Sequence, residues 1–252
     1  MSKKIYFISD AHLGAQTIAN PREQEKALVR FLDSIKQDAC TLFLMGDVLD
    51  FWFEYKKAIP RGFTRFFGKI VELTDSGIEV HWFVGNHDMW IFDYLPNELG
   101  VTIHYKPEEI TLLGKRFFLA HGDGLDNRST SFRIIQSIFH NKFCQWMLST
   151  IHPRWAIGLA HAWSKHSRVT GKHNSYQGED KEYLVCFSKK YLKEKNPEIQ
   201  YFIFGHRHIV LDLKIASDCK VLILGDWISE FSYATFNGND VLIDFFETEL
   251  RS

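Results

Sequence analysis

Residues 3–12 read KKIYFISDAH, and this short stretch sets a pattern that recurs along the chain. The run from Ile5 to Ile8 consists of β-branched and aromatic residues, which favour a β-strand. The run stops at Asp10 and His12, two residues apart, and in extended backbone that spacing points both side chains to one face. The stretch therefore predicts a buried strand that delivers two polar side chains to one place.

The same arrangement, an apolar run that stops at Asp, Asn or His, occurs four more times. The further runs are CTLFLMGDVLD (40–50), EVHWFVGNHD (79–88), KRFFLAHGD (115–123) and YFIFGHRH (201–208). His206 and His208 repeat the two-residue spacing of Asp10 and His12. Any one of these endings is explained by a turn or a helix cap, but their joint occurrence favours a functional site.

Helical periodicity separates the first three runs. REQEKALVRFLDSI (22–35) spaces Ala27, Phe31 and Ile35 at intervals of four, and GFTRFFGKIVELTDSG (62–77) ends in glycine. Alternating strands and helices predict a parallel sheet, in which ligands bind beyond the carboxyl ends of the strands. We therefore expect the five strand ends to converge on one crevice. Further strands are predicted in KVLILGDWI (220–228), FSYATFNG (231–238) and NDVLIDFF (239–246), completing a second sheet. Asp226 and Trp227 could face the site, but a turn after a buried strand is the favoured interpretation.

Clusters of Asp and His packed together without cations would be costly in a low dielectric, and divalent ions remove that cost. Nitrogen and oxygen ligands suit Mn²⁺ or Fe²⁺ and also accept Zn²⁺. The sequence therefore predicts a metal site.

The motifs D-x-H, G-D-x-x-D, G-N-H-D, H-G-D and G-H-x-H, in this order between residues 10 and 208, resemble the calcineurin-like metallophosphoesterases. The resemblance implies one domain over residues 1–252, an α/β fold with a four-layer αββα sandwich, and two divalent ions, Mn²⁺ foremost. It implies that one ion is held by Asp10, His12, Asp47 and His208. It implies that the other is held by Asp47, Asn86, His121 and His206, with Asp47 as the bridge.

Two such ions can lower the pKa of a bridging water and clamp a phosphoryl group during in-line attack. We expect the resulting hydroxide to attack phosphorus without a covalent enzyme intermediate. His87, oriented by Asp88, is expected to protonate the leaving oxygen or stabilise its charge, and His87 and Asn86 to contact substrate. A purely structural role for His87 and Asp88 is the equally weighted alternative. Asp50 and Asp123 are expected to hold ligands or loops in place.

The segment from residue 127 to 178 contains no Asp or Glu, seven Lys or Arg, and five His. Its apolar residues recur at helical spacing in two stretches, Phe132, Ile135, Phe139, Phe143 and Trp146, and Trp155, Leu159, Ala162 and Trp163. We predict a helical cap inserted at about residues 126–178. Its aromatic stripes could simply pack on the core, with the cations solvated. Alternatively, a basic aromatic cap suits a substrate with phosphates and acyl chains, and an anionic membrane surface.

Within the superfamily, the insertion and the blocks IYFISDAHLG, LMGDVLDFWFE and FLAHGDGLD resemble the UDP-2,3-diacylglucosamine pyrophosphatases of lipid A synthesis. That branch cleaves at the α-phosphorus, which implies UMP and 2,3-diacylglucosamine 1-phosphate as products. It also implies a bacterial cytoplasmic location, peripheral on the inner face of the cell membrane. The chain departs from many branch members in having His87 where they have Arg. Ser164, Arg168 and Lys172 lie in the region expected to bind substrate, with Arg168 as a phosphate clamp.

Composition limits the alternatives. The formal net charge is −1 and the basic stretch is confined to the insertion, so polymeric nucleic acid is not an expected partner. Four scattered cysteines and the lack of a signal-peptide pattern favour a reducing compartment. A related phosphodiesterase or nucleotide pyrophosphatase for small soluble substrates is the main rival. A non-catalytic protein-binding scaffold ranks lower, because all five motifs keep their ligand residues.

Overall fold

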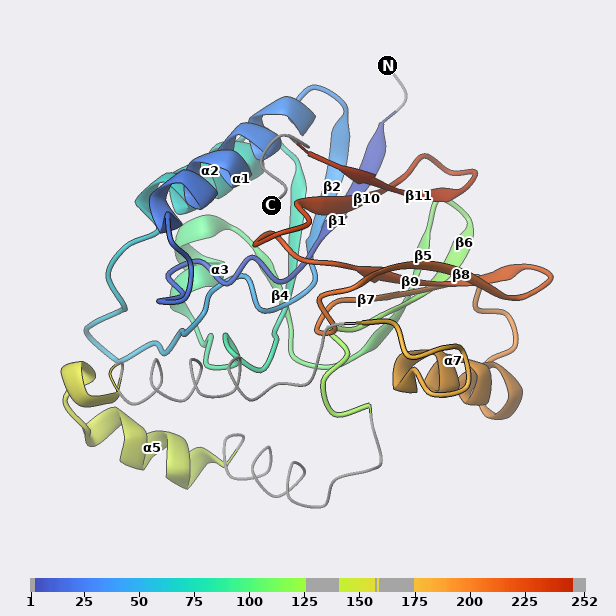
Figure 1. Cartoon of the computed structure of the whole chain (residues 1–252). Helices are drawn as coiled ribbons and strands as arrows, with labels where there is room; N and C mark the ends of the chain where they lie inside the picture. Colours follow the sequence, from blue (N-terminus) through green and yellow to red (C-terminus); the bar gives the residue numbers. More distant parts are fainter. Residues whose placement is uncertain (1–2, 126–140, 157, 159–174, 247–252) are drawn as a thin grey trace.

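Two β-sheets face each other at the centre of the molecule, in a computed structural model that describes residues 3–125, 141–156, 158 and 175–246 (Figure 1). The six-stranded first sheet has the order β11-β10-β1-β2-β3-β4, and the five-stranded second sheet the order β5-β6-β7-β9-β8. The first sheet comprises β1 (Lys4–Ile8), β2 (Ala39–Leu44), β3 (Glu79–Phe83), β4 (Thr102–His104), β10 (Ser232–Phe236) and β11 (Val241–Phe245). The second comprises β5 (Glu108–Leu112), β6 (Lys115–Leu119), β7 (Tyr201–Phe204), β8 (Val210–Ala216) and β9 (Cys219–Leu224).

Helices cover the outer faces of both sheets, which confirms the predicted four-layer αββα sandwich. The helices α1 (Pro21–Ile35), α2 (Thr64–Asp75) and α3 (Tyr94–Leu99) lie on the side of the first sheet, and α7 (Tyr183–Glu194) covers the second (Figure 1). The helix α5 (Lys142–Thr150) lies apart from both sheets and has no buried residue. None of the helices in the described part of the chain combines the length and apolar character that crossing a bilayer requires.

The central strands are apolar on both faces because each face meets its own core. In β1, Ile5 and Phe7 pack between the sheets, whereas Tyr6 and Ile8 pack under the helices. The second sheet repeats the pattern: Tyr201 and Ile203 of β7 face the core between the sheets, and their neighbours face α7. Continuous apolar runs are typical of strands that are covered on both sides.

The last two strands differ from the prediction that they complete the second sheet. Only β9 joins it; β10 pairs antiparallel with β1 and β11 with β10, so both extend the first sheet. Their inward residues Ala234, Phe236 and Val241 still pack in the core between the sheets. The alternation along each strand was therefore informative about burial, but it carries no information about which sheet edge a strand joins.

Parallel pairing brings the ends of six strands together. Strands β1, β2 and β3 run parallel in the first sheet, and β6, β7 and β9 run parallel in the second. The carboxyl end of each strand leads into a loop that carries Asp, Asn or His.

Candidate metal centre

All seven predicted metal ligands follow the carboxyl ends of these parallel strands, and both sheets contribute. The first sheet supplies Asp10, His12, Asp47 and Asn86, and the second supplies His121, His206 and His208. Backbone hydrogen bonds fix the loops to one another: the His12 N–H donates to the Asp47 carbonyl (2.9 Å), and the Gly205 N–H donates to the His121 carbonyl (2.9 Å).

Five of these seven residues adopt a left-handed backbone conformation, which is uncommon outside glycine. The φ angles are 54° at Asp10, 43° at His12, 52° at Asp47, 66° at His206 and 50° at His208. Such conformations each cost on the order of 1 kcal/mol or more and persist where the surroundings dictate them. Their concentration at the strand ends marks this edge of the molecule as a built site.

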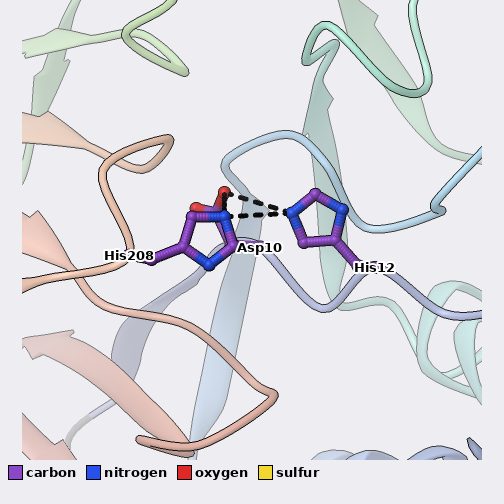
Figure 2. Close-up of side chains that lie close together, drawn as sticks. All are labelled: Asp10, His12 and His208. Carbon is purple, nitrogen blue, oxygen red and sulfur yellow. Dashed lines mark hydrogen bonds and ion pairs between the residues drawn. The ribbon is translucent and has the colours of Figure 1, made fainter. Parts of the chain in front are cut away.

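The first cluster consists of Asp10, His12 and His208 (Figure 2). The two imidazole Nε2 atoms lie 3.2 Å apart, and Asp10 Oδ1 lies 3.3 Å from His208 Nε2 and 3.7 Å from His12 Nε2. Asp10 and His12 are almost completely buried. One carboxylate oxygen and two ring nitrogens thus converge on a single point between β1 and β7.

The second cluster consists of Asp47, His121 and His206. Asp47 Oδ2 lies 3.3 Å from His121 Nε2, and on its other side 3.7 Å from His12 Nε2 of the first cluster. Its second oxygen is held by the His87 N–H at 2.8 Å. Asp47 therefore lies between the two clusters with one oxygen directed at both, which is the arrangement expected of a bridging carboxylate.

The histidines present one nitrogen to the centre and anchor the other outside it. His121 Nδ1 lies 2.8 Å from the Met45 carbonyl, and His208 Nδ1 lies 3.2 Å from Asp226 Oδ2. Since neither a carbonyl nor a carboxylate oxygen can donate, Nδ1 carries the proton and Nε2 offers its lone pair inward. Metal-binding histidines in proteins are held in this way by an acceptor behind the ring.

Glycines next to the ligands leave no room for a side chain. A Cβ atom at Gly205 would lie 1.9 Å from Ser9 Oγ and 2.5 Å from Asp10 Oδ2. A Cβ atom at Gly85 would lie 2.1 Å from Asp47 Oδ1. The glycine in G-N-H-D and in G-H-x-H is thus required by close packing against a ligand carboxylate.

Neighbouring charges at the centre shift one another's pKa values. Burial raises the pKa of Asp47, but the imidazoles of His121 and His87 outweigh it, so this pKa lies well below its ordinary value. Burial lowers the pKa of His121, but Asp47 outweighs that effect and holds it well above its ordinary value. Burial and the charge of His121 lower the pKa of His206 to about 4. The centre is thus rich in ionised carboxylate, which favours the binding of a cation.

The donor set fits divalent metal ions. Among the described residues, nothing donates a hydrogen bond to the buried Asp10 Oδ1 or Asn86 Oδ1, and nothing hydrogen-bonds to His121 Nε2. Buried polar atoms are normally satisfied, and an ion at each of the two clusters would satisfy these three. Only nitrogen and oxygen atoms point inward, which suits Mn²⁺, Fe²⁺ or Zn²⁺.

His87 lies at the edge of the first cluster, but Asp88 does not orient it as predicted. His87 Nδ1 lies 2.9 Å from the Asp50 carbonyl, and Nε2 lies 4.0 Å from Asp47 Oδ2. Asp88 instead points away from His87, because successive residues project to different sides of the backbone. Its carboxylate accepts hydrogen bonds from the backbone N–H groups of Gly85 (2.7 Å) and Val48 (2.9 Å) and from the indole N–H of Trp82. Burial and the charge of Asp47 raise the pKa of Asp88 to about 6. Asp88 thus ties the loops after β2 and β3 together.

Two further aspartates contact the ligand histidines from outside. Asp50, expected to hold ligands, lies with Oδ1 3.5 Å from His12 Nδ1. Asp226, for which a turn was favoured over a place facing the site, contacts His208. A sequence pattern pointed to Asp226 as a site residue: KVLILGD ends in Gly-Asp after a buried strand, as CTLFLMGD does. Burial raises the pKa of Asp226, but His208 and backbone donors outweigh it and lower the pKa far below its ordinary value.

The predicted substrate residues of the insertion, Ser164, Arg168 and Lys172, lie outside the described residues. Of its aromatic residues, Phe143 and Trp146 are described, and both are exposed, with 63% and 60% of their surface accessible. Trp155 is 68% exposed. These three side chains do not pack on the core.

Comparison with known proteins identifies the family to which this chain is similar. Residues 3–210 match the family described as calcineurin-like phosphoesterase. The chain is 41% identical to a UDP-2,3-diacylglucosamine hydrolase of Porphyromonas gingivalis, over 98% of this chain and 99% of that protein. It is 23% identical to a UDP-2,3-diacylglucosamine hydrolase of Shewanella baltica, over 93% of this chain and 94% of that protein. Among solved structures, the phosphoesterase YfcE from E. coli is similar with a TM-score of 0.43 and 15% identity, covering 92% of this chain and 87% of that one.

The family match includes every strand end that carries a predicted ligand, from Asp10 to His208. The Porphyromonas relative aligns over nearly the whole length of both proteins. With the two clusters joined at Asp47, the match leads to one conclusion: the chain belongs to the calcineurin-like phosphoesterase family.

Proposed function

We propose that this protein is a metal-dependent hydrolase that cleaves UDP-2,3-diacylglucosamine to UMP and 2,3-diacylglucosamine 1-phosphate. The observation that carries the proposal is the pair of Asp/His clusters joined at Asp47, in a chain 41% identical to a protein named for hydrolysis of this substrate. The proposal also rests on the exposed aromatic helix α5, which offers apolar surface to a lipid.

The proposed ligand sets follow the two clusters. Asp10, His12 and His208 would hold one ion, and His121 and His206 the other. Asp47 would contribute to both, and Asn86 Oδ1 would complete the second set. Two divalent ions, for which Mn²⁺ is our first choice, would supply an activated water and neutralise the charge of the phosphoryl oxygens.

Side chains of the protein would protonate the leaving group and hold the metal-binding histidines in position. His87 presents Nε2 to the centre while the Asp50 carbonyl accepts from its Nδ1–H. Burial lowers the pKa of His87, so the negative charge of a bound substrate would have to favour the protonated ring before it donates to a phosphoryl oxygen or the leaving phosphate. Asp226 and Asp50 would keep the rings of His208 and His12 in their coordinating orientation.

A cap inserted at about residues 126–178 into a single domain would bind the lipid half. Its described part exposes Phe143, Trp146, Met147 and Trp155, while Lys142 lies over the Phe92 ring at 5.7 Å. We propose that this surface contacts the acyl chains and the anionic inner face of a bacterial cell membrane, from the cytoplasmic side. Arg168, Ser164 and Lys172 are proposed phosphate contacts in the same insertion.

The experiment is turnover by the Mn²⁺-loaded protein of three substrates: UDP-2,3-diacylglucosamine, UDP-glucose and bis(p-nitrophenyl) phosphate. Products are followed by ³¹P NMR. The proposal predicts UMP and lipid 1-phosphate, with a kcat/KM for the lipid far above that for UDP-glucose. Hydrolysis of the aryl diester without turnover of the lipid would leave the metal chemistry and overturn the assignment of substrate.

A further inference from the structure

A buried glutamine on the first helix contacts both loops that lead to the first cluster. The buried face of α1 consists of five apolar residues and one polar residue, Gln24, which is 6% exposed. Its side-chain nitrogen Nε2 lies 2.6 Å from the Ala11 carbonyl oxygen and 2.8 Å from the Trp227 carbonyl oxygen. Because carbonyl oxygens can only accept hydrogen bonds, the NH₂ group of Gln24 donates to both of them.

The first of these carbonyls belongs to the residue between two candidate ligands. Ala11 is flanked by Asp10 and His12, whose left-handed backbones persist only where their surroundings dictate them. The Asp10 N–H donates to the Gly46 carbonyl (3.1 Å), and the His12 N–H donates to the Asp47 carbonyl (2.9 Å). The Ala11 carbonyl is held by a side chain instead, so a substitution can remove this support from the turn while the backbone contacts remain.

The second carbonyl lies next to the carboxylate that contacts His208. Trp227 follows Asp226, whose Oδ2 lies 3.2 Å from His208 Nδ1. The Trp227 N–H donates to the Asp10 carbonyl at 3.2 Å, and its own carbonyl accepts from Gln24. The amide of Gln24 therefore connects the loop after β1, which carries two candidate ligands of the first cluster, to the loop after β9, which orients the third.

The surroundings of Gln24 favour a role beyond packing. Among the described residues, nothing donates a hydrogen bond to its buried Oε1 atom. A buried acceptor without a partner destabilises a fold, and an apolar side chain of similar size would avoid that loss. The hydrogen bonds to the two carbonyls are therefore what distinguishes glutamine from methionine or leucine at this position.

We infer that Gln24 is a positioning residue for the first cluster, whose amide holds the loops after β1 and β9 in the arrangement that one metal ion requires. Both of its N–H groups are engaged by these two loops, and neither reaches the loops that carry His121 and His206. Its effect should therefore be confined to one of the two ions. The inference rests on the ligand sets of the proposed function, but not on the identity of the substrate.

The experiment measures Mn²⁺ binding to the full chain by isothermal titration calorimetry and electron paramagnetic resonance. The wild type should bind two ions with an exchange-coupled signal. Gln24→Met keeps the length of the side chain and removes both donors, so the Kd of one ion should rise about ten-fold, while that of the other stays near its wild-type value. At Mn²⁺ concentrations between the two Kd values, the variant should show the signal of an isolated ion. Gln24→Glu, which puts an oxygen in place of the NH₂ group, should weaken the same ion at least as much.

Two further variants separate positioning from general stability. Ser188→Ala removes a buried hydroxyl that donates to the Leu184 carbonyl at 2.8 Å within α7. It should lower the unfolding temperature of the metal-free protein without changing the Kd of either ion. His208→Ala should remove the ion of the first cluster, and adding Gln24→Met to that variant should leave the Kd of the remaining ion unchanged.

The role of Gln24 is wrong if the wild type binds two coupled ions and Gln24→Met binds both with wild-type affinity. It is equally wrong if Gln24→Met weakens the ion that remains in the His208→Ala protein; in both cases the ligand sets stand. A wild type that binds fewer than two ions would overturn the ligand sets and the role of Gln24 with them. A wild type that binds two coupled ions but does not turn over the UDP-lipid would overturn the proposed substrate, whereas loss of one ion in Gln24→Met would still support the role of Gln24.

Discussion

At the residue scale, the site is a set of histidines whose orientation is fixed from behind. Asp226 shows this most clearly: one carboxylate oxygen contacts His208 Nδ1 (3.2 Å), and the other accepts from the N–H groups of Ile228 (2.9 Å) and Ser229 (2.7 Å). The carboxylate therefore links a metal-facing ring to a tight turn. Its position, rather than direct contact with substrate, is what would matter to the reaction.

Asp226→Asn tests this role. The amide can still accept from the turn, but its NH₂ group would face His208 Nδ1–H, so the ring must rotate or change tautomer. We expect metal affinity to fall by about 10–100-fold with little change in the unfolding temperature, measured by Mn²⁺ titration and calorimetry. Ser229→Ala is the control, since its hydroxyl contacts the same carboxylate (3.2 Å) without touching His208. Equal Mn²⁺ affinity in Asp226→Asn and the wild type would contradict the role.

The convergence of the candidate ligands could be predicted from the sequence, because each one follows an apolar run that is typical of a covered strand. What could not be predicted is the partner of each ring. Asp88 adjoins His87 in sequence but points to the loop after β2, and Asp50, far away in the chain, takes its place. Partners behind the rings depend on how loops from different strands pack, and local spacing does not encode that.

At the scale of elements, buried carboxylates hold the ligand-carrying loops to the framework. Glu54 accepts from the N–H groups of Phe92, Asp93 and Tyr94 (2.7, 2.7 and 3.0 Å) and so binds the loop after β2 to the start of α3. On the other sheet, Arg207, between the candidate ligands His206 and His208, donates two hydrogen bonds to Glu182 (2.9 and 3.2 Å), just before α7. Glu182 is 1% exposed.

Glu182→Ala should therefore destabilise the fold. Removing one partner of a buried ion pair leaves the other charge uncompensated, a loss of about 3 kcal/mol in the free energy of unfolding. Urea denaturation of the metal-free protein measures it. Lys189→Ala removes the exposed pair between Lys189, on α7, and Glu179, which precedes that helix, and should have no measurable effect. If the two variants unfold alike, Glu182 does not anchor the Arg207 turn.

The elements themselves were largely predictable. The helix α1 follows from the four-residue spacing of its apolar residues, and Ala27, Phe31 and Ile35 form its buried face. The strands covered on both sides follow from their continuous apolar runs. The placement of β10 and β11 was not, because strand pairing between distant segments depends on which sheet edge remains open once β1 and β2 have paired.

At the scale of the whole molecule, the candidate metal centre joins residues of the two sheets. Asp10, His12 and Asp47 come from the first, whereas His121, His206 and His208 come from the second. An ion held by residues of both sheets binds only the assembled fold, so metal binding should stabilise the molecule as a whole.

Removal of metal should therefore lower the unfolding temperature. A ligand at a hundred times its Kd stabilises by about 2.7 kcal/mol, and for a chain of this size 1 kcal/mol corresponds to roughly 2–4 °C. We expect chelation to lower the midpoint by about 5–10 °C and added Mn²⁺ to restore it, measured by calorimetry at constant ionic strength. A midpoint that does not respond to chelation of a fully loaded sample would contradict a centre shared between the sheets.

The most direct test of the bridging role of Asp47 is the metal content of the Asp47→Ala variant. If one carboxylate joins two clusters, the wild type binds two Mn²⁺ per chain with an exchange-coupled electron paramagnetic resonance signal, and the variant loses most of both ions. His87→Ala, at the edge of the centre, should keep both. An Asp47→Ala protein that still binds two Mn²⁺ ions with wild-type affinity and a coupled signal would contradict the bridging role of Asp47.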